Sequence, residues 1–225
     1  MEIEKIATIR TDFKTKFGIP RQGGIVEKLK GEIVFEPKYN SADAIREIES
    51  FSHLWLIWGF SENEGAKYNA TVRPPRLGGN TRVGVFASRS SFRPNGLGLS
   101  LVRLDAVEKL PNNTHILKVS CVDMVDKTPI YDIKPYLPHL DYAQDARGGF
   151  ATEVEGYELD VSCDGELLSR LDEEKREVLL EILAQDPRPS YIEDSERVYG
   201  FFYAGFEIKF RVDGKSLYVI SIEKE

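Results

Sequence analysis

Short apolar runs bounded by turn residues recur along the first 140 residues. Runs rich in β-branched or aromatic side chains are typical of strands, and they cover Ile3–Ile9, Glu32–Phe35, His53–Phe60, Arg82–Ala87, Ser100–Val107, Ile116–Val122 and Pro129–Ile133. One short helix is predicted between the second and third runs. Ser41 can cap it, and its apolar stripe is Ala44, Ile45 and Ile48. Strand–helix alternation with a glycine-rich turn is absent, which argues against a Rossmann fold. The pattern predicts an antiparallel sheet that closes into a barrel or stacks as a sandwich.

After about residue 140 the apolar pattern becomes helical and then returns to strands. Apolar residues at i, i+3, i+4 and i+7 predict an amphipathic helix over Glu166–Ala184. Two strands, Tyr199–Val212 and Leu217–Ile222, are predicted to follow it. A hairpin turn at Asp213-Gly214 is expected to join them.

These patterns divide the chain into two parts. Asp141–Gly149 is polar and ends in glycines, so residues 141–150 are predicted to link a domain of residues 1–140 to a domain of residues 151–225. A unit of about 75 residues buries little surface by itself, and we expect the second domain to pack on the first or on another subunit. The predicted fold class is mainly β: an antiparallel β-barrel-like N-terminal domain with a small α+β C-terminal domain.

Charge is segregated along the chain. The net charge is −7, and residues 151–225 hold 19 acidic and 9 basic side chains. From Gly65 to Leu104 there is no carboxylate, and the basic residues there are Lys67, Arg73, Arg76, Arg82, Arg89, Arg93 and Arg103. The acidic total argues against non-specific nucleic-acid binding, but a basic patch of this kind can still bind phosphates. The alternatives to phosphate binding are that these basic residues form a solvated loop, or that they form ion pairs with the acidic residues of 151–225.

Several function classes lack support in the sequence. No apolar run is long enough to span a membrane, and the N-terminus lacks a signal-peptide layout. The two cysteines, Cys121 and Cys163, suggest a reducing compartment, so we expect a cytoplasmic protein. The three histidines lie far apart in sequence, which predicts no metal site. No nucleophile elbow or phosphate-binding loop is present. Alkyl transfer from an activated donor needs none of these features, because the enzyme mainly aligns two reactants.

Longer motifs resemble a known family. They are PRQGG (Pro20–Gly24), FSHLW (Phe51–Trp55), the block Thr71–Ser100, VDMVDKTPIYDIKPYLP (Val122–Pro138) and AQDPRPSY (Ala184–Tyr191). Together, and in this order, they resemble the TrmO family of S-adenosylmethionine-dependent tRNA methyltransferases. The resemblance covers nearly the whole chain. It implies methylation of N6 of threonylcarbamoyl-adenosine at position 37, beside the anticodon. It also implies a β-barrel donor-binding domain, a small C-terminal domain and a homodimer.

The resemblance also implies site residues. Those expected to bind S-adenosylmethionine are Arg21, Gln22, Gly23, Arg89, Leu99, Cys121, Val122 and Asp123. Those expected to bind tRNA are Arg73, Arg76, Arg82, Arg93, Arg188 and Tyr191. The candidates for the catalytic group are Asp123 and Asn95, and neither is assigned. A carboxylate that accepts an N6 hydrogen would act as a modest general base.

Structural interpretations remain open beside these roles. Asp123 and Asp126 can serve in turns, and Asp126 is the better candidate for one. Arg89 and Arg93 can close ion pairs with the tail. Pro187 can simply stop a helix. The rival to an enzyme is a β-barrel module that binds RNA or a nucleotide without catalysis.

Overall fold

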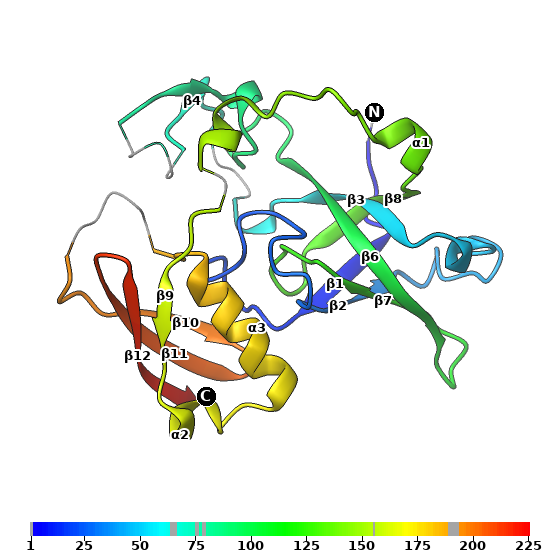
Figure 1. Cartoon of the computed structure of the whole chain (residues 1–225). Coiled ribbons are helices and arrows are strands. Elements are labelled where there is room, and N and C mark those ends of the chain that lie inside the picture. Colours follow the sequence, from blue (N-terminus) through cyan, green and yellow to red (C-terminus); the bar gives the residue numbers. More distant parts are fainter. Residues whose placement is uncertain (1, 64–66, 75–76, 78–79, 155, 189–193) are drawn as a thin grey trace.

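The computed structural model describes residues 2–63, 67–74, 77, 80–154, 156–188 and 194–225. Within them, a closed antiparallel barrel forms the N-terminal part and a smaller α+β region follows (Figure 1). The barrel strands run in the order β1, β2, β7, β6, β3, β8, and β8 pairs with β1. Their bounds are β1 Ala7–Thr11, β2 Gly31–Phe35, β3 His53–Gly59, β6 Leu97–Lys109, β7 His115–Ser120 and β8 Pro129–Pro135. The mainly β class predicted from the sequence is confirmed.

Alternating apolar residues fill the barrel. Along β3, Leu54, Leu56 and Trp58 are buried, whereas Trp55 and Ile57 between them are only partly buried. Successive side chains of a strand point to opposite faces, so this alternation places one apolar face inside. The sequence predicted these strands by a different signal, their short apolar runs rich in β-branched or aromatic residues.

Between β3 and β6 the chain leaves the barrel as an arm (residues 60–96, described at 60–63, 67–74, 77 and 80–96; Figure 1). Its elements are η2 Ser61–Asn63, β4 Thr71–Val72, β5 Val83–Gly84 and the 3-10 helix η4 Val85–Ala87. The predicted strand Arg82–Ala87 is therefore mostly wrong. Only Val83 and Gly84 pair with β4, because the chain then turns and Ser88 N–H bonds to Val85 O at 3.2 Å.

The predicted helix that starts at Ser41 is also wrong. Residues 42–47 form turns, and only the 3-10 helix η1 (Ile48–Ser50) is helical. Glu47 has a φ of 67°, a left-handed conformation that a regular right-handed helix does not include.

The C-terminal region, called the tail below, contains a four-stranded sheet with the order β10, β11, β12, β9. Strand β9 is parallel to β12, and the other pairs are antiparallel. The bounds are β9 Asp160–Ser162, α2 Gly165–Leu168, α3 Glu173–Ala184, β10 Tyr199–Tyr203, β11 Phe206–Asp213 and β12 Ser216–Lys224. The short helices α1 (Pro138–Asp141) and η5 (Gly149–Val154) precede the sheet. These two helices overlap the ends of the predicted linker, residues 141–150. That this linker separates two domains stays a prediction.

The helix predicted over Glu166–Ala184 is split into α2 and α3. Asp172 has extended backbone angles, and its carboxylate accepts a hydrogen bond from Lys175 N–H at 2.9 Å. An aspartate in this conformation caps a new helix N-terminus. The apolar period continues across the break, which is why the pattern alone merged the two helices.

The strand predicted over Tyr199–Val212 is split as well. It folds back at Ala204 and Gly205, whose φ values are 51° and 81°. The hairpin predicted at Asp213-Gly214 is confirmed, since Asp213 pairs with Ser216 across the turn. Gly214 has a φ of 57° there, which glycine adopts without strain.

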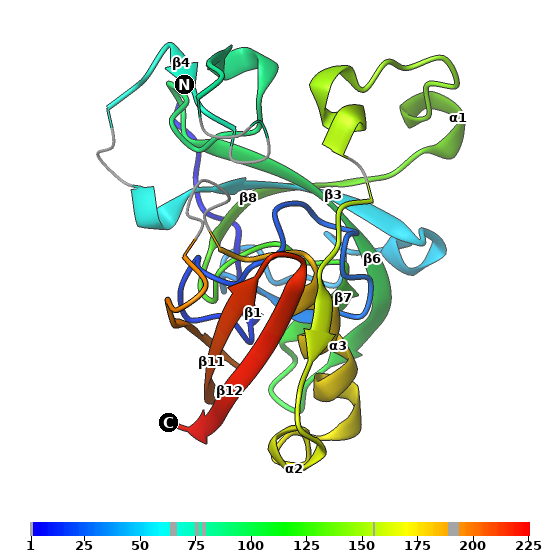
Figure 2. The same cartoon turned by 60° about the vertical axis from the view of Figure 1, so that its left-hand side comes forward.

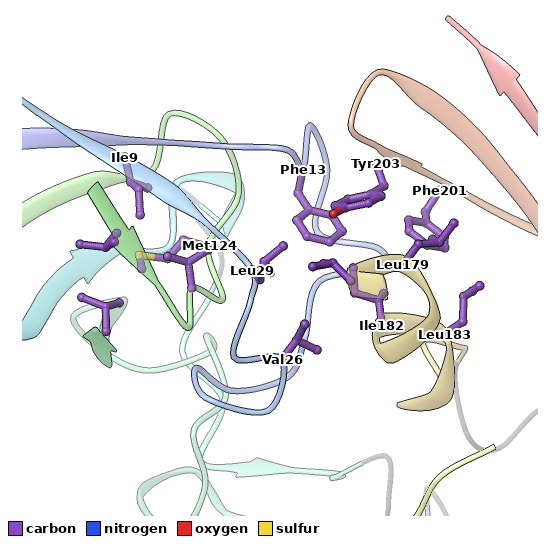
Figure 3. Packing of buried hydrophobic residues seen from close by; sticks show 14 of the residues in the cluster. Ile9, Phe13, Val26, Leu29, Met124, Leu179, Ile182, Leu183, Phe201 and Tyr203 are labelled. Atoms are coloured by element: carbon purple, nitrogen blue, oxygen red, sulfur yellow. The ribbon is translucent and has the colours of Figure 1, made fainter. Parts of the chain in front are cut away.

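The barrel and the tail share one hydrophobic core (Figure 3). The ring centroid of Phe13 lies 5.4 Å from that of Tyr203 and 6.5 Å from that of Phe201, both on β10. Figure 3 shows Val26 and Leu29 of the barrel side facing helix α3. The tail thus packs on the barrel of its own chain, one of the two expected arrangements.

Charged side chains of the tail pair with oppositely charged side chains of the barrel side at the rim of this core. The pairs include Lys28–Glu177, Lys30–Glu174 and Asp12–Lys175. Exposed pairs of this kind contribute about 0–1 kcal/mol each, so the apolar contact dominates the association. Among the described residues, no ion pair joins an arginine of the arm to a tail carboxylate. In the described part of the chain, the tail carboxylates therefore leave the arginines of the arm without such pairs.

Candidate active site

A cleft of about 1620 Å³ opens between the arm, the barrel and the tail. The arm contributes Arg73, Phe86 and Arg89 to its wall, and the barrel contributes Trp58 and Asp123. Residues 16–22, 147–151 and 185–188 also line it. Figure 2 shows the β4 ribbon of the arm and the segment that carries α1 above the barrel. Small-molecule sites usually measure about 300–1,000 Å³, so this cleft has room for a small molecule and part of a larger partner.

Asp123 lies three residues beyond the end of β7 and is held by two donors. Its Oδ2 accepts a hydrogen bond from Gly23 N–H at 2.7 Å, and its Oδ1 accepts one from Ser100 Oγ at 2.6 Å. Ser100, on β6, accepts a hydrogen bond from Trp58 Nε1 of β3 at 2.9 Å. The carboxylate is therefore oriented by groups from three segments.

Burial raises the pKa of Asp123 above the ordinary value of an aspartate. The hydrogen bonds from Ser100 and Gly23 oppose this shift, and the positive charge of Arg89 opposes it further. Since the side chain is only partly buried, it remains accessible from the cleft. A fixed, accessible carboxylate with a raised pKa can accept a proton or bind a polar ligand group.

Asp126 makes structural contacts instead of facing the cleft. Its Oδ1 accepts a hydrogen bond from Thr11 N–H at 3.1 Å, and its own N–H bonds to Phe13 O at 2.7 Å. These contacts tie the turn after Asp123 to β1, as the turn interpretation of Asp126 predicted.

Gly23 packs against the backbone of the barrel. A Cβ on this residue would lie 2.8 Å from Cys121 O and 3.3 Å from Leu101 O. Glycine thus permits a close approach to the chain's own carbonyl groups, which brings the Gly23 N–H to Asp123.

The PRQ segment connects the arm to the tail. Arg89 Nη1 of the arm donates to Gln22 Oε1, and Gln22 Nε2 donates to Arg21 O at 2.5 Å. Arg21 Nη2 donates to the backbone O atoms of Asp186 and Arg188, at 3.3 and 3.5 Å. The three predicted donor-binding side chains Arg21, Gln22 and Arg89 therefore form one continuous set of contacts.

Arg188 forms a buried ion pair within the tail. Its Nε lies 3.0 and 3.2 Å from the two carboxylate oxygens of Asp186. The side chains of Arg188 and Asp186 are only 11% and 6% exposed. The guanidinium of Arg188 is thus largely committed to the loop that follows α3, although the residue lines the cleft.

The cleft brings together part of the predicted donor site. Arg21, Gln22, Arg89 and Asp123 line it, and Gly23 joins it through its bond to Asp123. The described lining does not include the other three predicted residues. Val122 is buried in the barrel core, Cys121 is half-buried, and Leu99 is exposed on β6.

Only some of the predicted tRNA-binding residues line the cleft. Arg73 and Arg82 line the cleft, and Arg82 Nη1 donates to Thr71 Oγ1 at 3.0 Å. Arg93 instead closes its own loop by donating to Ser88 O at 2.8 Å. Arg76 and Tyr191 lie outside the described residues.

Asn95, the second catalytic candidate, is exposed in the turn before β6 and is not part of the described lining of the cleft.

Sequence reasoning missed Trp58 and Ser100. Ser100 is only 3% exposed, and a polar residue at an inward position of an apolar strand requires a buried partner. The position of Ser100 in its strand was the signal by which the sequence could have indicated it as a site residue. Lys16 and Arg147, which also line the cleft, had no signal beyond their charge.

The part of the chain that the structure describes shows neither a metal-binding cluster nor a membrane-spanning helix. No group of three or more His, Cys, Asp or Glu side chains is placed to hold a metal ion there. None of the helices described is long and apolar enough to cross a membrane.

Each of the two regions matches a domain of a known protein family. The family description "tRNA-methyltransferase O N-terminal domain" matches residues 8–142, and "TrmO C-terminal domain" matches residues 157–225. A tRNA (adenine(37)-N6)-methyltransferase of Escherichia coli is 42% identical, with 99% of this chain and 97% of that one aligned. A putative S-adenosylmethionine-dependent methyltransferase of Pseudomonas aeruginosa is 40% identical, over 84% of this chain and 82% of that one.

A crystal structure of TrmO from Pseudomonas aeruginosa superposes with a TM-score of 0.77 at 29% identity, covering 99% of this chain and 98% of that one. The fold, the order of the two regions and the sequence therefore agree. This chain belongs to the TrmO family of tRNA methyltransferases.

Proposed function

We propose that this chain transfers a methyl group from S-adenosylmethionine to N6 of adenosine 37 in tRNA, on an adenine that carries a threonylcarbamoyl group. The relative named for the adenine-37 N6 reaction aligns with 99% of this chain. The structural observation that carries the proposal is the cleft in which the Asp123 carboxylate lies together with arginines of the arm.

The residues of the cleft fit the methyl donor chemically. When bound, S-adenosylmethionine supplies an electrophilic methyl group, so the protein's task is to bind and orient the two reactants. The guanidinium of Arg89 suits the donor's carboxylate, because its geometry matches that group. The amide of Gln22 provides both a donor and an acceptor, as recognition of an adenine ring requires.

Asp123 is the group that receives the N6 proton in this proposal. The exocyclic nitrogen of adenine is a weak nucleophile, because its lone pair is delocalised into the ring. As the new N–C bond forms, the S–CH3 bond of the donor would break and leave S-adenosylhomocysteine, while the carboxylate accepts the N6 proton and later releases it to water. A raised pKa improves this base, since it brings the proton affinity of the carboxylate closer to neutrality. Gly23 and Ser100 hold the carboxylate in place.

The arginines of the arm bind the phosphates of the tRNA in this proposal. Arg73 and Arg82 line the cleft, together with Lys16 and Arg147 from other segments. Guanidinium groups form charge-assisted hydrogen bonds with phosphate oxygens. The positive wall therefore suits an RNA backbone placed beside Asp123.

We further infer that the chain acts as a cytoplasmic homodimer. Large apolar side chains remain exposed outside the cleft, among them Leu99 at 54%, Leu140 at 70% and Tyr142 at 68%. Exposed apolar groups of this size often mark protein contacts. Light scattering should give the mass of a dimer, and a monomeric mass at micromolar concentration would refute this part.

The function is tested by incubating the purified chain with labelled S-adenosylmethionine and two tRNAs that differ only at position 37. The tRNA with modified adenosine 37 should gain label, and the tRNA with guanosine 37 should gain none. Binding of tRNA without transfer of label would instead favour the rival, a non-enzymatic RNA-binding barrel. Equal labelling of both tRNAs would place the methyl group elsewhere.

A further inference from the structure

Phe86 is the most exposed large apolar side chain that the structure describes, at 74%. It lies in η4, whose neighbouring residue Val85 is 1% exposed. Val85 N–H bonds to Ala70 O at 3.0 Å, and Ser88 Oγ donates to Val85 O at 2.9 Å. Val85 is thus a buried anchor whose backbone N–H and C=O are both hydrogen-bonded, and it holds the Phe86 ring in solvent.

The ring faces the cleft among cationic side chains. Phe86 lines the cleft with Arg82, four residues before it, and Arg89, three residues after it. Phe92, which is 46% exposed, belongs to the same wall. The sequence from Gly65 to Leu104 contains no carboxylate. An exposed aromatic ring that lines the same cleft as two arginines combines an apolar, planar contact with a positive field.

This combination matches an unpaired nucleotide. A nucleobase has a flat face that stacks on aromatic rings, and its phosphate binds arginine. An acidic protein segment would satisfy the arginines but would leave the planar face of Phe86 without a matched partner. A base in a helix is already stacked on its neighbours, whereas a base in a loop is free to stack on protein.

We propose that Phe86 stacks on an unpaired base of the tRNA anticodon loop and so holds the loop in the cleft that contains Asp123. This inference rests on the proposed function, because it takes tRNA as the substrate. It assigns the recognition of the loop to stacking by the arm, in addition to the contacts that its arginines make with phosphates.

The test compares Phe86→Ala, Phe86→Leu and Phe86→Trp in the full chain. Equilibrium binding of modified tRNA is measured at several salt concentrations, without donor. Stacking contributes enough that Phe86→Ala should weaken tRNA binding by roughly 5- to 100-fold. Phe86→Trp should restore binding, and Phe86→Leu should not, because leucine retains apolar area but has no aromatic face. The salt dependence should keep its slope, since no phosphate contact is removed.

Tyr218→Ala is the matched control. Tyr218 is 40% exposed on β12, and the guanidinium carbon of Arg211 lies 5.5 Å from its ring centroid. It thus combines an aromatic ring with an arginine outside the described lining of the cleft, and its removal should leave tRNA binding unchanged. Donor affinity, measured by calorimetry, should be the same in all variants.

Three results would overturn the stacking proposal: unchanged tRNA binding in Phe86→Ala, full binding in Phe86→Leu, or conversion of a dimer into a monomer by Phe86→Ala. The last result would make the ring a contact between subunits. The proposed function fails separately, because wild-type protein that binds tRNA through Phe86 without methylating it would refute the enzyme and retain the stacking contact.

Discussion

Ser100 Oγ donates a 2.6 Å hydrogen bond to Oδ1 of Asp123, from the neighbouring strand β6 to the segment that follows β7. Ser100 is itself held by Trp58 Nε1 at 2.9 Å. The orientation of the carboxylate therefore depends on side chains that do not themselves need to touch a substrate. This makes Ser100 a positioning residue with measurable consequences.

Replacement of Ser100 by alanine should lower kcat for methyl transfer by about tenfold, which corresponds to the loss of one hydrogen bond to a charged group. Because that bond lowers the pKa of Asp123, its loss should raise this pKa further. The acid limb of the pH–rate profile should then move to higher pH, and a purely structural role would not move it.

Ser120→Ala is the control for this experiment. Ser120 is fully buried, and its Oγ donates to Asp105 Oδ1 at 3.0 Å, outside the described lining of the cleft. The acid limb of the pH–rate profile of Ser120→Ala should match that of the wild type. An identical shift of the acid limb in both variants would mean that the loss of any buried serine hydroxyl near β7 has this effect. It would then contradict a specific role of Ser100 in the site.

Replacement of Asp123 by asparagine should lower methyl transfer by at least about 100-fold, as expected when a general base is lost. The variant should also lose the pH dependence of stability that this group causes. With a folded pKa above the unfolded value of about 3.9, the folded chain binds more protons between the two values. The wild type therefore loses stability as pH rises through that window.

Thermal denaturation across this acidic range measures the effect. The melting temperature of Asp123→Asn should rise relative to that of the wild type as the pH increases. A constant difference between the two proteins would contradict the raised pKa.

The barrel was predictable from the sequence because its strands are short apolar runs rich in β-branched or aromatic residues, as in β3 (His53–Gly59). The helix expected from Ser41 failed because an apolar stripe does not reveal a left-handed residue such as Glu47. The split of α2 from α3 was missed because the cap at Asp172 interrupts the backbone without interrupting the apolar period.

The site was only partly predictable for a related reason. Family motifs pointed to Asp123 and Arg89, and both line the cleft. The contact of Trp58 with Ser100 depends on the pairing of β3 with β6, which local patterns do not specify. Likewise, the link from Arg21 to the loop at Asp186 joins segments 165 residues apart.

Gly23→Ala should destabilise the fold, because its Cβ would lie 2.8 Å from Cys121 O. A clash with backbone cannot be relieved by a rotamer change, so we expect a loss of about 1–3 kcal/mol in the free energy of unfolding. Urea denaturation measures it. Gly165→Ala is the control, since nothing lies within 4 Å of a Cβ at this first residue of α2. That variant should be neutral or slightly more stable, and equal losses in both would refute the packing role of Gly23.

Tyr203→Phe should stabilise the contact between the barrel and the tail by about 1 kcal/mol. Tyr203 is fully buried, and its hydroxyl has no hydrogen-bond partner among the described residues. Removal of that hydroxyl relieves a desolvation cost and keeps the ring packed against Phe13. Urea denaturation should show a higher midpoint with an unchanged slope, whereas a lower midpoint would reveal that the hydroxyl is bonded.

The most direct measurement of the central claim is mass spectrometry of nucleosides from tRNA treated with this protein and S-adenosylmethionine. The substrate is tRNA that carries threonylcarbamoyl-adenosine at position 37, and Asp123→Asn protein serves as the control. This nucleoside should gain one methyl group at N6 with the wild type, and the gain should be strongly reduced with Asp123→Asn. A methyl group on another nucleoside, or no methylated product from folded protein that binds the donor, would contradict it.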